Sequence, residues 1–485
     1  MNAGVPYCSG PVTRRAAMQF GSLALGGLGL ADLFRLQARA AAPVPAAGVK
    51  SVTRGTSRGK EDNAVIFVWL PGGPPHMEMY DLKPEAPLEY RGAFSPIHTN
   101  VPGIDVGELL PLHARCADKF NIIRSIAHQF ADHGGGHKRF LTGRDPKEPT
   151  GFVNDYPAVG SMVAKMVEKR KRGIPNYVCG TDNGRQGIDV FSFGSSYLGN
   201  AVHPFMVPGD PSAADFKVNN LAPTAGLETR LESRVDLLSK FDRWRRTAAD
   251  RTVMDSMDEF NRRALELVTS EKARKAFDLS QEPTAVRERY GMHAYGQRAL
   301  MARRLVEAGV TFVTMVMENP NVPGGLPKHV SYNWDSHAVN CHIFDDAKVR
   351  FPYYDQAVTA LIEDLYARGL DRRVLLVVTG EFGRTPRVSY SVGTQTGVMQ
   401  PGRDHWPNSM SMIVSGGGMR TGQVIGATNA KGEYPVDRAM TPNDLWASVL
   451  LHLGIDAHHA FLDHAGRPMP ILPFGEPIAE LLPTA

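Results

Sequence analysis

Uninterrupted apolar runs restrict the fold of this chain more than any other feature. Residues 64–70 read AVIFVWL and are followed at once by Pro71-Gly72-Gly73, so the run is apolar on both faces and ends in a tight turn. A strand of that kind fits the centre of a parallel sheet that is covered on both sides. Similar runs recur at residues 121–127, 310–317, 374–379 and 411–414, and helical patterns lie between several of them. The alternation predicts a doubly wound, mostly parallel α/β sheet with helices on both faces.

Residues 229–291 follow a different pattern. Apolar side chains recur there at three- and four-residue spacing among charged ones: Leu231, Val235, Leu238, Phe241 and Trp244. Such a stripe is typical of amphipathic helices. We therefore expect a helical insertion at about residues 229–291 within one α/β domain that spans residues 63–485.

The first 40 residues have the pattern of an export leader. Arg14-Arg15 precedes an uncharged stretch, residues 16–31, that is too short and too rich in glycine to span a hydrocarbon core of about 30 Å. Ala38-Arg39-Ala40 offers small residues for cleavage, and residues 41–62 read as a linker. We expect export by the twin-arginine route to the periplasm or the extracellular space, with no transmembrane segment after leader removal. An uncleaved amphipathic anchor is the alternative.

Charge and cysteine content narrow the class of partner. The chain has 54 basic and 50 acidic residues, and when the four arginines and one aspartate of the leader are set aside, 50 and 49 remain. A nearly neutral body has no basic field for phosphate backbones, so nucleic acid is not an expected partner. Cys116, Cys179 and Cys341 lie beyond the leader in no Cys-x-x-Cys pair, and we expect them to be buried.

Histidines and carboxylates follow the first two predicted strands. The first group is His76 and Asp81, and the second is His128, Asp132, His133 and His137. The spacing of His133 and His137 is i, i+4, so a helix that starts near residue 133 would place both imidazoles on one face, at a chelating distance. The start of such a helix would also offer N–H groups to an anion.

Two further groups follow later strands. The third group is Asp335 and His337 in NWDSH. The fourth comes in two pieces, which are Glu381 and Arg384 in VVTGEFGRTP and Arg403, Asp404 and His405 in GRDHWP. Glu381 comes directly after a very apolar run, where a parallel sheet presents ligands. Arg384 and Arg403 are suited to bind an anionic group, and a structural ion pair with Glu381 or Asp404 is the alternative.

Because the carboxyl ends of parallel strands share one edge of a sheet, we expect these groups to meet around a divalent metal. Mixed imidazole and carboxylate ligands favour zinc first, with manganese, iron or calcium as alternatives. The expected metal ligands are Asp335, His337, Glu381, Asp404 and His405. The expected catalytic residues are His133, His137 and Arg384. Further candidates are His76, Asp81, His128, Asp132 and Arg403.

Several long segments resemble a family of exported bacterial proteins known as domain of unknown function 1501, which is placed in the alkaline phosphatase/sulfatase superfamily. They are TRR in the leader, WLPGGPPH, HGGGHKRFLTGR, ALMARRLVEAGVTFV, NWDSH, VVTGEFGRTP and GRDHWP, and together they cover essentially the whole chain. The resemblance implies an alkaline-phosphatase-like α/β fold with one or two metals at the carboxyl edge of the sheet. It also implies hydrolysis of phosphate or sulfate esters.

HGGGHKRFLTGR is similar to the nucleophile segment of sulfatases, with which Leu141-Thr142-Gly143-Arg144 agrees closely. The chain departs from that pattern at two places. His133 occupies the position of the nucleophilic Cys or Ser and His137 that of the arginine, and Glu381-Phe382 replaces the usual Asp-His pair. The resemblance therefore implies metal binding but not a covalent nucleophile.

Two functions remain. The first is an exported metal-dependent hydrolase of phosphate or sulfate esters, which acts through metal-activated water on an anionic small-molecule or polysaccharide ester. The second is a non-catalytic, metal-containing protein that binds sulfated or phosphorylated glycans. The number of histidines and carboxylates favours the enzyme, and the sequence leaves the oligomeric state open.

Overall fold

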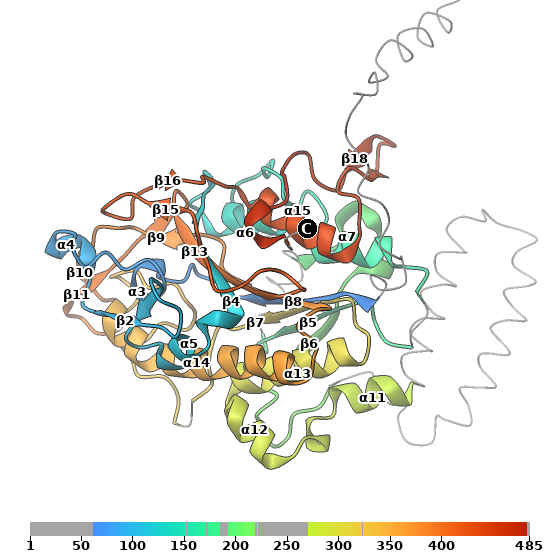
Figure 1. Ribbon diagram of the computed structural model, residues 1–485, viewed down its shortest axis with the longest axis horizontal. Coiled ribbons are helices and arrows are strands. Elements are labelled where there is room, and N and C mark those ends of the chain that lie inside the picture. Colours follow the sequence, from blue (N-terminus) through green and yellow to red (C-terminus); the bar gives the residue numbers. More distant parts are fainter. Residues whose placement is uncertain are drawn as a thin grey trace, which may run out of the picture. The chain divides into compact units, whose positions relative to one another are not determined.

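The computed structural model describes residues 62–151, 153–170, 173–184, 193–218, 221, 270–322 and 324–482. At its centre lies an eight-stranded sheet in the order β14, β4, β13, β8, β1, β7, β5, β6 (Figure 1). The strands are β1 (Ala64–Trp69), β4 (Phe120–Ile126), β5 (Tyr177–Thr181), β6 (Phe205–Pro208), β7 (Phe312–Val316), β8 (Val374–Thr379), β13 (Met410–Gly416) and β14 (Val424–Ile425).

Strand direction confirms the predicted mostly parallel sheet. Every neighbouring pair is parallel except the two pairs of β13, which runs antiparallel to both β4 and β8. The apolar run at residues 411–414 is thus a central strand of the opposite direction. A parallel strand needs a crossover connection, usually a helix. The chain from β8 to β13 instead passes only through short strands, so it re-enters the sheet from the edge at which it left.

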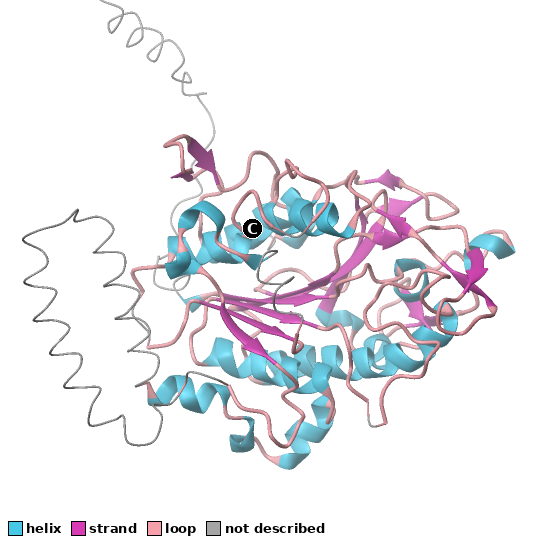
Figure 2. Ribbon diagram, turned by 180° about the vertical axis from the view of Figure 1, so that it is seen from behind, coloured by secondary structure: helices cyan, strands magenta, loops and turns pink. Residues whose placement is uncertain are grey.

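Helices cover both faces of the sheet, as Figures 1 and 2 show from opposite sides. Helices α5 (Pro111–Arg115), α12 (Thr284–Tyr290), α13 (Ala294–Glu307) and α14 (Ile343–Ala367) lie on one side, and α6 (His133–Thr142), α7 (Val159–Met166) and α15 (Pro442–Leu453) on the other. The remaining α-helices of the described residues are α3 (His76–Met79), α4 (Leu88–Arg91) and α11 (Glu271–Phe277). Short 3₁₀ helices are η3 (Ala117–Lys119), η4 (Ser196–Leu198), η5 (Asn200–Val202), η6 (Leu279–Gln281) and η7 (Ala479–Leu481).

The central strand β1 contributes to two cores, one on each face. Ile66 and Val68 pack in the core beside α13 and α14. Phe67 and Trp69 point to the other face, where the Phe67 ring lies 5.2 Å from that of Trp446 in α15. Because both sets are fully buried, each side chain contributes about 1.5–3 kcal/mol of transfer free energy. For the same reason β1 cannot alternate between apolar and polar side chains.

Short two-stranded sheets build the loops at the edge of the large sheet. They are β2 (Pro96–His98) with β3 (Asp105–Gly107), β9 (Gly383–Arg384) with β12 (His405–Trp406), β10 (Ser389–Val392) with β11 (Met399–Gly402), β15 (Ala427–Thr428) with β16 (Pro435–Asp437), and β17 (Ala460–Leu462) with β18 (Pro468–Pro470). The pair β9–β12 sets His405 opposite Arg384, and so fixes His405 beside the loop that follows β8.

Some expectations fall outside the described residues. These are the export leader at residues 1–40, the linker up to residue 61, and the insertion over residues 229–269. The described end of the expected insertion, residues 270–291, forms α11 and α12. Among the helices of the described ranges, none has both the length and the apolar character needed to cross a bilayer. Cys116, Cys179 and Cys341 are buried, as expected.

Candidate metal centre

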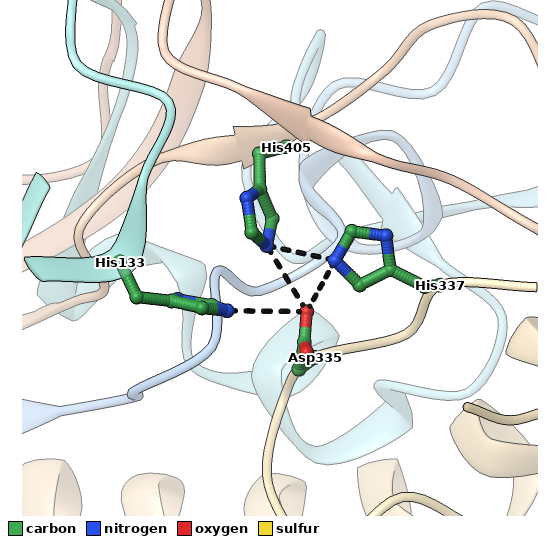
Figure 3. Close-up of side chains that lie close together, drawn as sticks. All are labelled: His133, Asp335, His337 and His405. Atoms are coloured by element: carbon green, nitrogen blue, oxygen red, sulfur yellow. Dashed lines mark hydrogen bonds and ion pairs between the residues drawn. The ribbon is translucent and has the colours of Figure 1, made fainter. Parts of the chain in front are cut away.

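Side chains from three distant segments meet at the carboxyl edge of the sheet. His133 is the first residue of α6, which follows β4, and Asp335 and His337 lie in the loop between β7 and α14. His405 lies on β12 and reaches the same place. Ligand atoms of these four residues all lie within 4.8 Å of one another, and Figure 3 shows the three imidazoles around the Asp335 carboxylate. The expected convergence of the histidine and carboxylate groups is therefore present.

The first turn of α6 depends on three consecutive glycines. Glycine is a poor helix former, but a Cβ on Gly134 would lie 2.2 Å from the carbonyl oxygen of Gly151. The close approach of that loop thus requires glycine. Asp132 caps the helix, because its Oδ1 accepts hydrogen bonds from the N–H groups of Gly134 at 2.9 Å and Gly135 at 3.4 Å. These N–H groups serve the cap, and the expected anion cradle is not formed by them.

His337 and His405 are held in one tautomer by acceptors on their Nδ1 atoms. His337 Nδ1 lies 2.7 Å from Asp404 Oδ1, and His405 Nδ1 lies 2.6 Å from the carbonyl oxygen of Ala131. A carbonyl and an ionised carboxylate only accept, so each Nδ1 carries a proton, and in the neutral ring Nε2 is then a bare lone pair. Both Nε2 atoms face Asp335 Oδ1, at 2.8 Å from His337 and 3.2 Å from His405.

The two nitrogens also face each other, and this contact suits a cation. His337 Nε2 and His405 Nε2 are 2.8 Å apart (Figure 3). Two lone pairs and a carboxylate oxygen at such distances repel unless a positive charge lies among them. Imidazoles whose Nδ1–H is bound to a carboxylate or a carbonyl are the usual ligands of zinc and related metals. The donor set therefore fits a divalent metal.

The His133 ring contacts Asp335 in the centre with one nitrogen and the neighbouring carboxylate of Glu381 with the other. Its Nδ1 lies 2.8 Å from Glu381 Oε1, and its Nε2 lies 3.4 Å from Asp335 Oδ1. Burial alone would lower the pKa of His133, but the hydrogen bonds to Asp335 and Glu381 outweigh burial and raise it to about 9. A dication beside the ring would lower that pKa again by repulsion.

Arg384 is fully buried and holds the Asp335 carboxylate in place. Its Nη2 donates to Asp335 Oδ1 at 2.7 Å and to the Trp334 carbonyl at 3.1 Å. The same Nη2 donates to the Gly72 carbonyl, and Nε donates to the Gly73 carbonyl at 2.8 Å. Burial alone would raise the pKa of Asp335, but the three imidazoles around it and the charge of Arg384 hold it far below its usual value. Arg384 thus joins two loops and presents no donor to an anion.

Glu381 lies next to the centre and is fully buried. Its Oε1 accepts from the Gly72 N–H at 2.8 Å and lies 3.3 Å from His137 Nε2. Burial alone would raise the pKa of Glu381, but His137 and His133 hold it well below its usual value. The structure places Glu381 with His133 and His137 in a second group of candidate ligands, rather than in the group around Asp335.

The remaining candidates hold the loops around the centre. His76 accepts from the Arg384 N–H, Asp81 accepts from Thr428, and Arg403 donates to Glu78 Oε1 at 2.7 Å. His128 Nε2 donates to the Glu381 carbonyl at 2.6 Å, while its Nδ1 accepts from the Phe130 N–H. Burial lowers the pKa of both His76 and His128 to about 4. The arginine pairs thus differ from the expected ones, because Arg384 pairs with Asp335 and Arg403 with Glu78.

Two backbone groups of the centre could not be found from the sequence. The Ala131 carbonyl orients His405, and the Gly72 N–H binds Glu381. Every residue carries such groups, so no residue type marks them. The Phe382 ring, 4.4 Å from that of His405, is a third neighbour for which residue type gave no functional signal.

The chain matches the model of the family described as protein of unknown function (DUF1501) over residues 62–482. It belongs to this family, as the sequence motifs indicated. A comparison with curated proteins found no match.

Similar solved structures include proteins of the superfamily that the sequence resembles. A lipoteichoic acid synthase from Listeria monocytogenes has 11% identity and a TM-score of 0.36, over 84% of this chain and 76% of that one. A sulfatase from Pseudoalteromonas has 10% identity and a TM-score of 0.32, over 82% and 69%. Alkaline phosphatase from the Antarctic bacterium TAB5 has 11% identity and a TM-score of 0.34, over 81% and 98%. At such scores their activities do not transfer to this chain.

Proposed function

We propose that this protein is an exported, metal-dependent hydrolase of phosphate or sulfate esters. The convergence of imidazole Nε2 atoms on the Asp335 carboxylate carries the proposal, because that arrangement suits a cation. Asp335, His337 and His405 would hold the metal, zinc first among the candidates. A divalent metal bound there supplies a Lewis acid for a phosphoryl or sulfuryl oxygen and lowers the pKa of water.

The residues of the chain then divide the remaining work. No Ser, Thr or Cys stands at the first position of α6, so water is the attacking group. Nε2 of His133, which is bare once a dication beside the ring has lowered its pKa, accepts the proton of that water. The His133 side chain is 27% exposed, so substrate and water reach it. Asp404 and the Ala131 carbonyl keep His337 and His405 in the metal-binding tautomer. Arg384 keeps the Asp335 carboxylate in place.

Turnover of an aryl phosphate and an aryl sulfate by the zinc-loaded, purified protein tests this function. We expect hydrolysis that a chelator abolishes and that added zinc restores. His405→Ala removes a ligand and should lower kcat/KM at least 100-fold. His458→Ala, at an exposed position outside the centre, is the matched control and should keep wild-type turnover. Metal-loaded wild-type protein that turns over no ester of a broad panel would contradict the enzyme.

The alternative, a non-catalytic binding protein for sulfated or phosphorylated glycans, has two observations in its favour. His133 replaces the nucleophile of the related sulfatase segment, and the buried Arg384 offers no donor to an anion. It predicts that a sulfated or phosphorylated polysaccharide raises the Tm without release of sulfate or phosphate. Release of product in the same sample would exclude it.

A further inference from the structure

The second group of candidate ligands, His133, His137 and Glu381, adjoins the first and shares His133 with it. The two groups use opposite nitrogens of that ring, because Nδ1 lies 2.8 Å from Glu381 Oε1 and Nε2 faces Asp335. A neutral imidazole has only one bare nitrogen. His133 therefore cannot serve a cation in each group unless it loses both ring protons.

The three imidazoles of the centre are held in the same way. Each Nδ1 is within 2.8 Å of an acceptor oxygen, which is Asp404 for His337, the Ala131 carbonyl for His405 and Glu381 for His133. Asp404 and the carbonyl are positioned behind their rings and face away from the Nε2 side. Because Glu381 accepts from His133 Nδ1 as Asp404 and the Ala131 carbonyl accept from the other two rings, Glu381 is the acceptor that orients His133.

The hydrogen bonds of Glu381 oppose a cation in the second group. Its Oε1 accepts the Gly72 main-chain N–H at 2.8 Å, and His137 Nε2 lies 3.3 Å away. The N–H places a positive partial charge beside Oε1, the Glu381 oxygen that faces His133 and His137, and it is fixed by the turn that follows β1. A cation on His133 Nδ1 would also have to displace the proton donated to Glu381.

We propose that the centre takes one divalent cation, on Asp335, His337 and His405, and that Glu381 with His137 is a positioning pair for His133. The inference rests on the cation binding of the proposed function. Three protein ligands leave a position open for substrate or water, as in catalytic zinc sites. Glu381 keeps the His133 proton on Nδ1, so that its bare Nε2 faces that position.

One atom of Glu381 makes the inference open to direct test. Oε2 is buried and has no hydrogen-bond partner among the described residues, so a second cation would bind there. The number of cations per chain therefore separates the two arrangements. It is measured by elemental analysis and native mass spectrometry of metal-free protein titrated with Zn²⁺. We expect one zinc per chain, and two would overturn the inference while leaving the proposed function intact.

Variants test the role of each carboxylate. Glu381→Gln keeps an acceptor oxygen for His133, so one zinc should still bind, with affinity within 10-fold of wild type. In the same variant kcat should fall at least 10-fold, and KM should stay unchanged. Asp404→Asn is the matched control, because Asp404 orients a ligand, and its zinc affinity should fall about 10–100-fold. Asp335→Asn should bind no zinc at the centre.

His133→Ala separates a proton acceptor from a fourth ligand. We expect it to bind one zinc with affinity close to wild type and to lose turnover. A loss of affinity as large as that of His405→Ala would show that His133 is a ligand, and loss of zinc in Glu381→Gln would show the same for Glu381. Either result overturns the inference. If Glu381→Gln fails to fold, the zinc count of the wild type and of His133→Ala still decides. No zinc bound by the wild type would instead contradict the proposed function.

Discussion

At the scale of single residues, the role of a side chain in this protein depends on what binds its second polar atom. His337 and His128 are both histidines that follow predicted strands. His337 donates a hydrogen bond from Nδ1 to a carboxylate, which leaves Nε2 for the centre. Both nitrogens of His128 are instead hydrogen-bonded to backbone groups. The first arrangement suits a metal ligand and the second a structural residue.

Arg384 provides a residue-scale prediction about stability. Arg384→Met would leave Asp335 and the carbonyls of Gly72, Gly73 and Trp334 without their donor in a buried site. We expect a loss of about 3–5 kcal/mol in the free energy of unfolding, measured in urea on metal-free protein.

Two further substitutions calibrate the Arg384 result. Arg384→Lys should recover only part of the loss, because an ammonium cannot reach the same set of acceptors. The exposed Arg387→Met should stay within about 0.5 kcal/mol of wild type. Equal stability of Arg384→Met and Arg387→Met would contradict the structural role.

A buried histidine at a helix start gives a prediction about pH. His293 caps α13, its Nδ1 accepts from the Gly296 N–H, and burial lowers its pKa to about 4. The unfolded chain, with a pKa near 6.5, takes up the proton first, so stability is lost as the pH falls from 6.5 towards 4. We expect His293 to account for about 2 kcal/mol of the loss between pH 7 and pH 5.

His293→Asn tests this assignment. Asparagine caps a helix as well as any residue but does not titrate in this range. Urea unfolding at pH 7 and pH 5 should therefore show a smaller drop in the variant than in the wild type, by that amount. An equal drop in both proteins would assign the acid sensitivity to other histidines.

At the scale of elements, α6 is a helix that its own sequence disfavours. Three glycines in its first turn reduce its propensity, yet packing against the loop that contains Gly151 leaves no room for a Cβ at Gly134. The Asp132 cap and this packing outweigh propensity. As a result, His133 stands at the start of the helix and His137 one turn later, where both meet Glu381.

Alanine substitutions in this turn test the packing argument. Gly134→Ala gains about 1 kcal/mol in propensity but forces a contact of 2.2 Å with a backbone oxygen, so we expect a net loss of about 1–3 kcal/mol. Gly136→Ala has the same gain, and its Cβ would meet the Phe382 side chain at 2.9 Å. Because a side chain yields more readily than backbone, its cost should be smaller. A stabilised Gly134→Ala, in urea unfolding, would contradict the argument.

At the scale of the whole molecule, the sheet brings together segments that are far apart in the chain. Strands β4, β8, β1 and β7 point the same way, so the loops after them share one edge. The antiparallel β13 lies between β4 and β8 and returns the chain from the loop that bears His405. A metal centre at this edge thus requires the complete fold.

The proposed export concerns the whole molecule as well, because the twin-arginine route carries folded proteins. We propose that Arg14 and Arg15 direct the chain to that route. Replacing both with lysine should leave the protein in the cytoplasm, as measured by fractionation and immunoblotting, while Arg35→Lys, also in the leader, serves as the control. Equal export of the two variants would contradict the proposal.

Sequence alone determined the chemistry available to this protein. The apolar runs predicted the buried strands, and the residue types after them predicted a mixed imidazole and carboxylate centre. Its expected ligands were Asp335, His337, Glu381, Asp404 and His405, with His133 and His137 beside them. Only the tertiary structure decided the direction of β13, the separation of Glu381 and Asp404 from the ligands around Asp335, and the burial of Arg384. The physical reason is that residue type fixes which atoms can bind. Which atom faces the centre depends on acceptors such as the Ala131 carbonyl, brought there by distant strands.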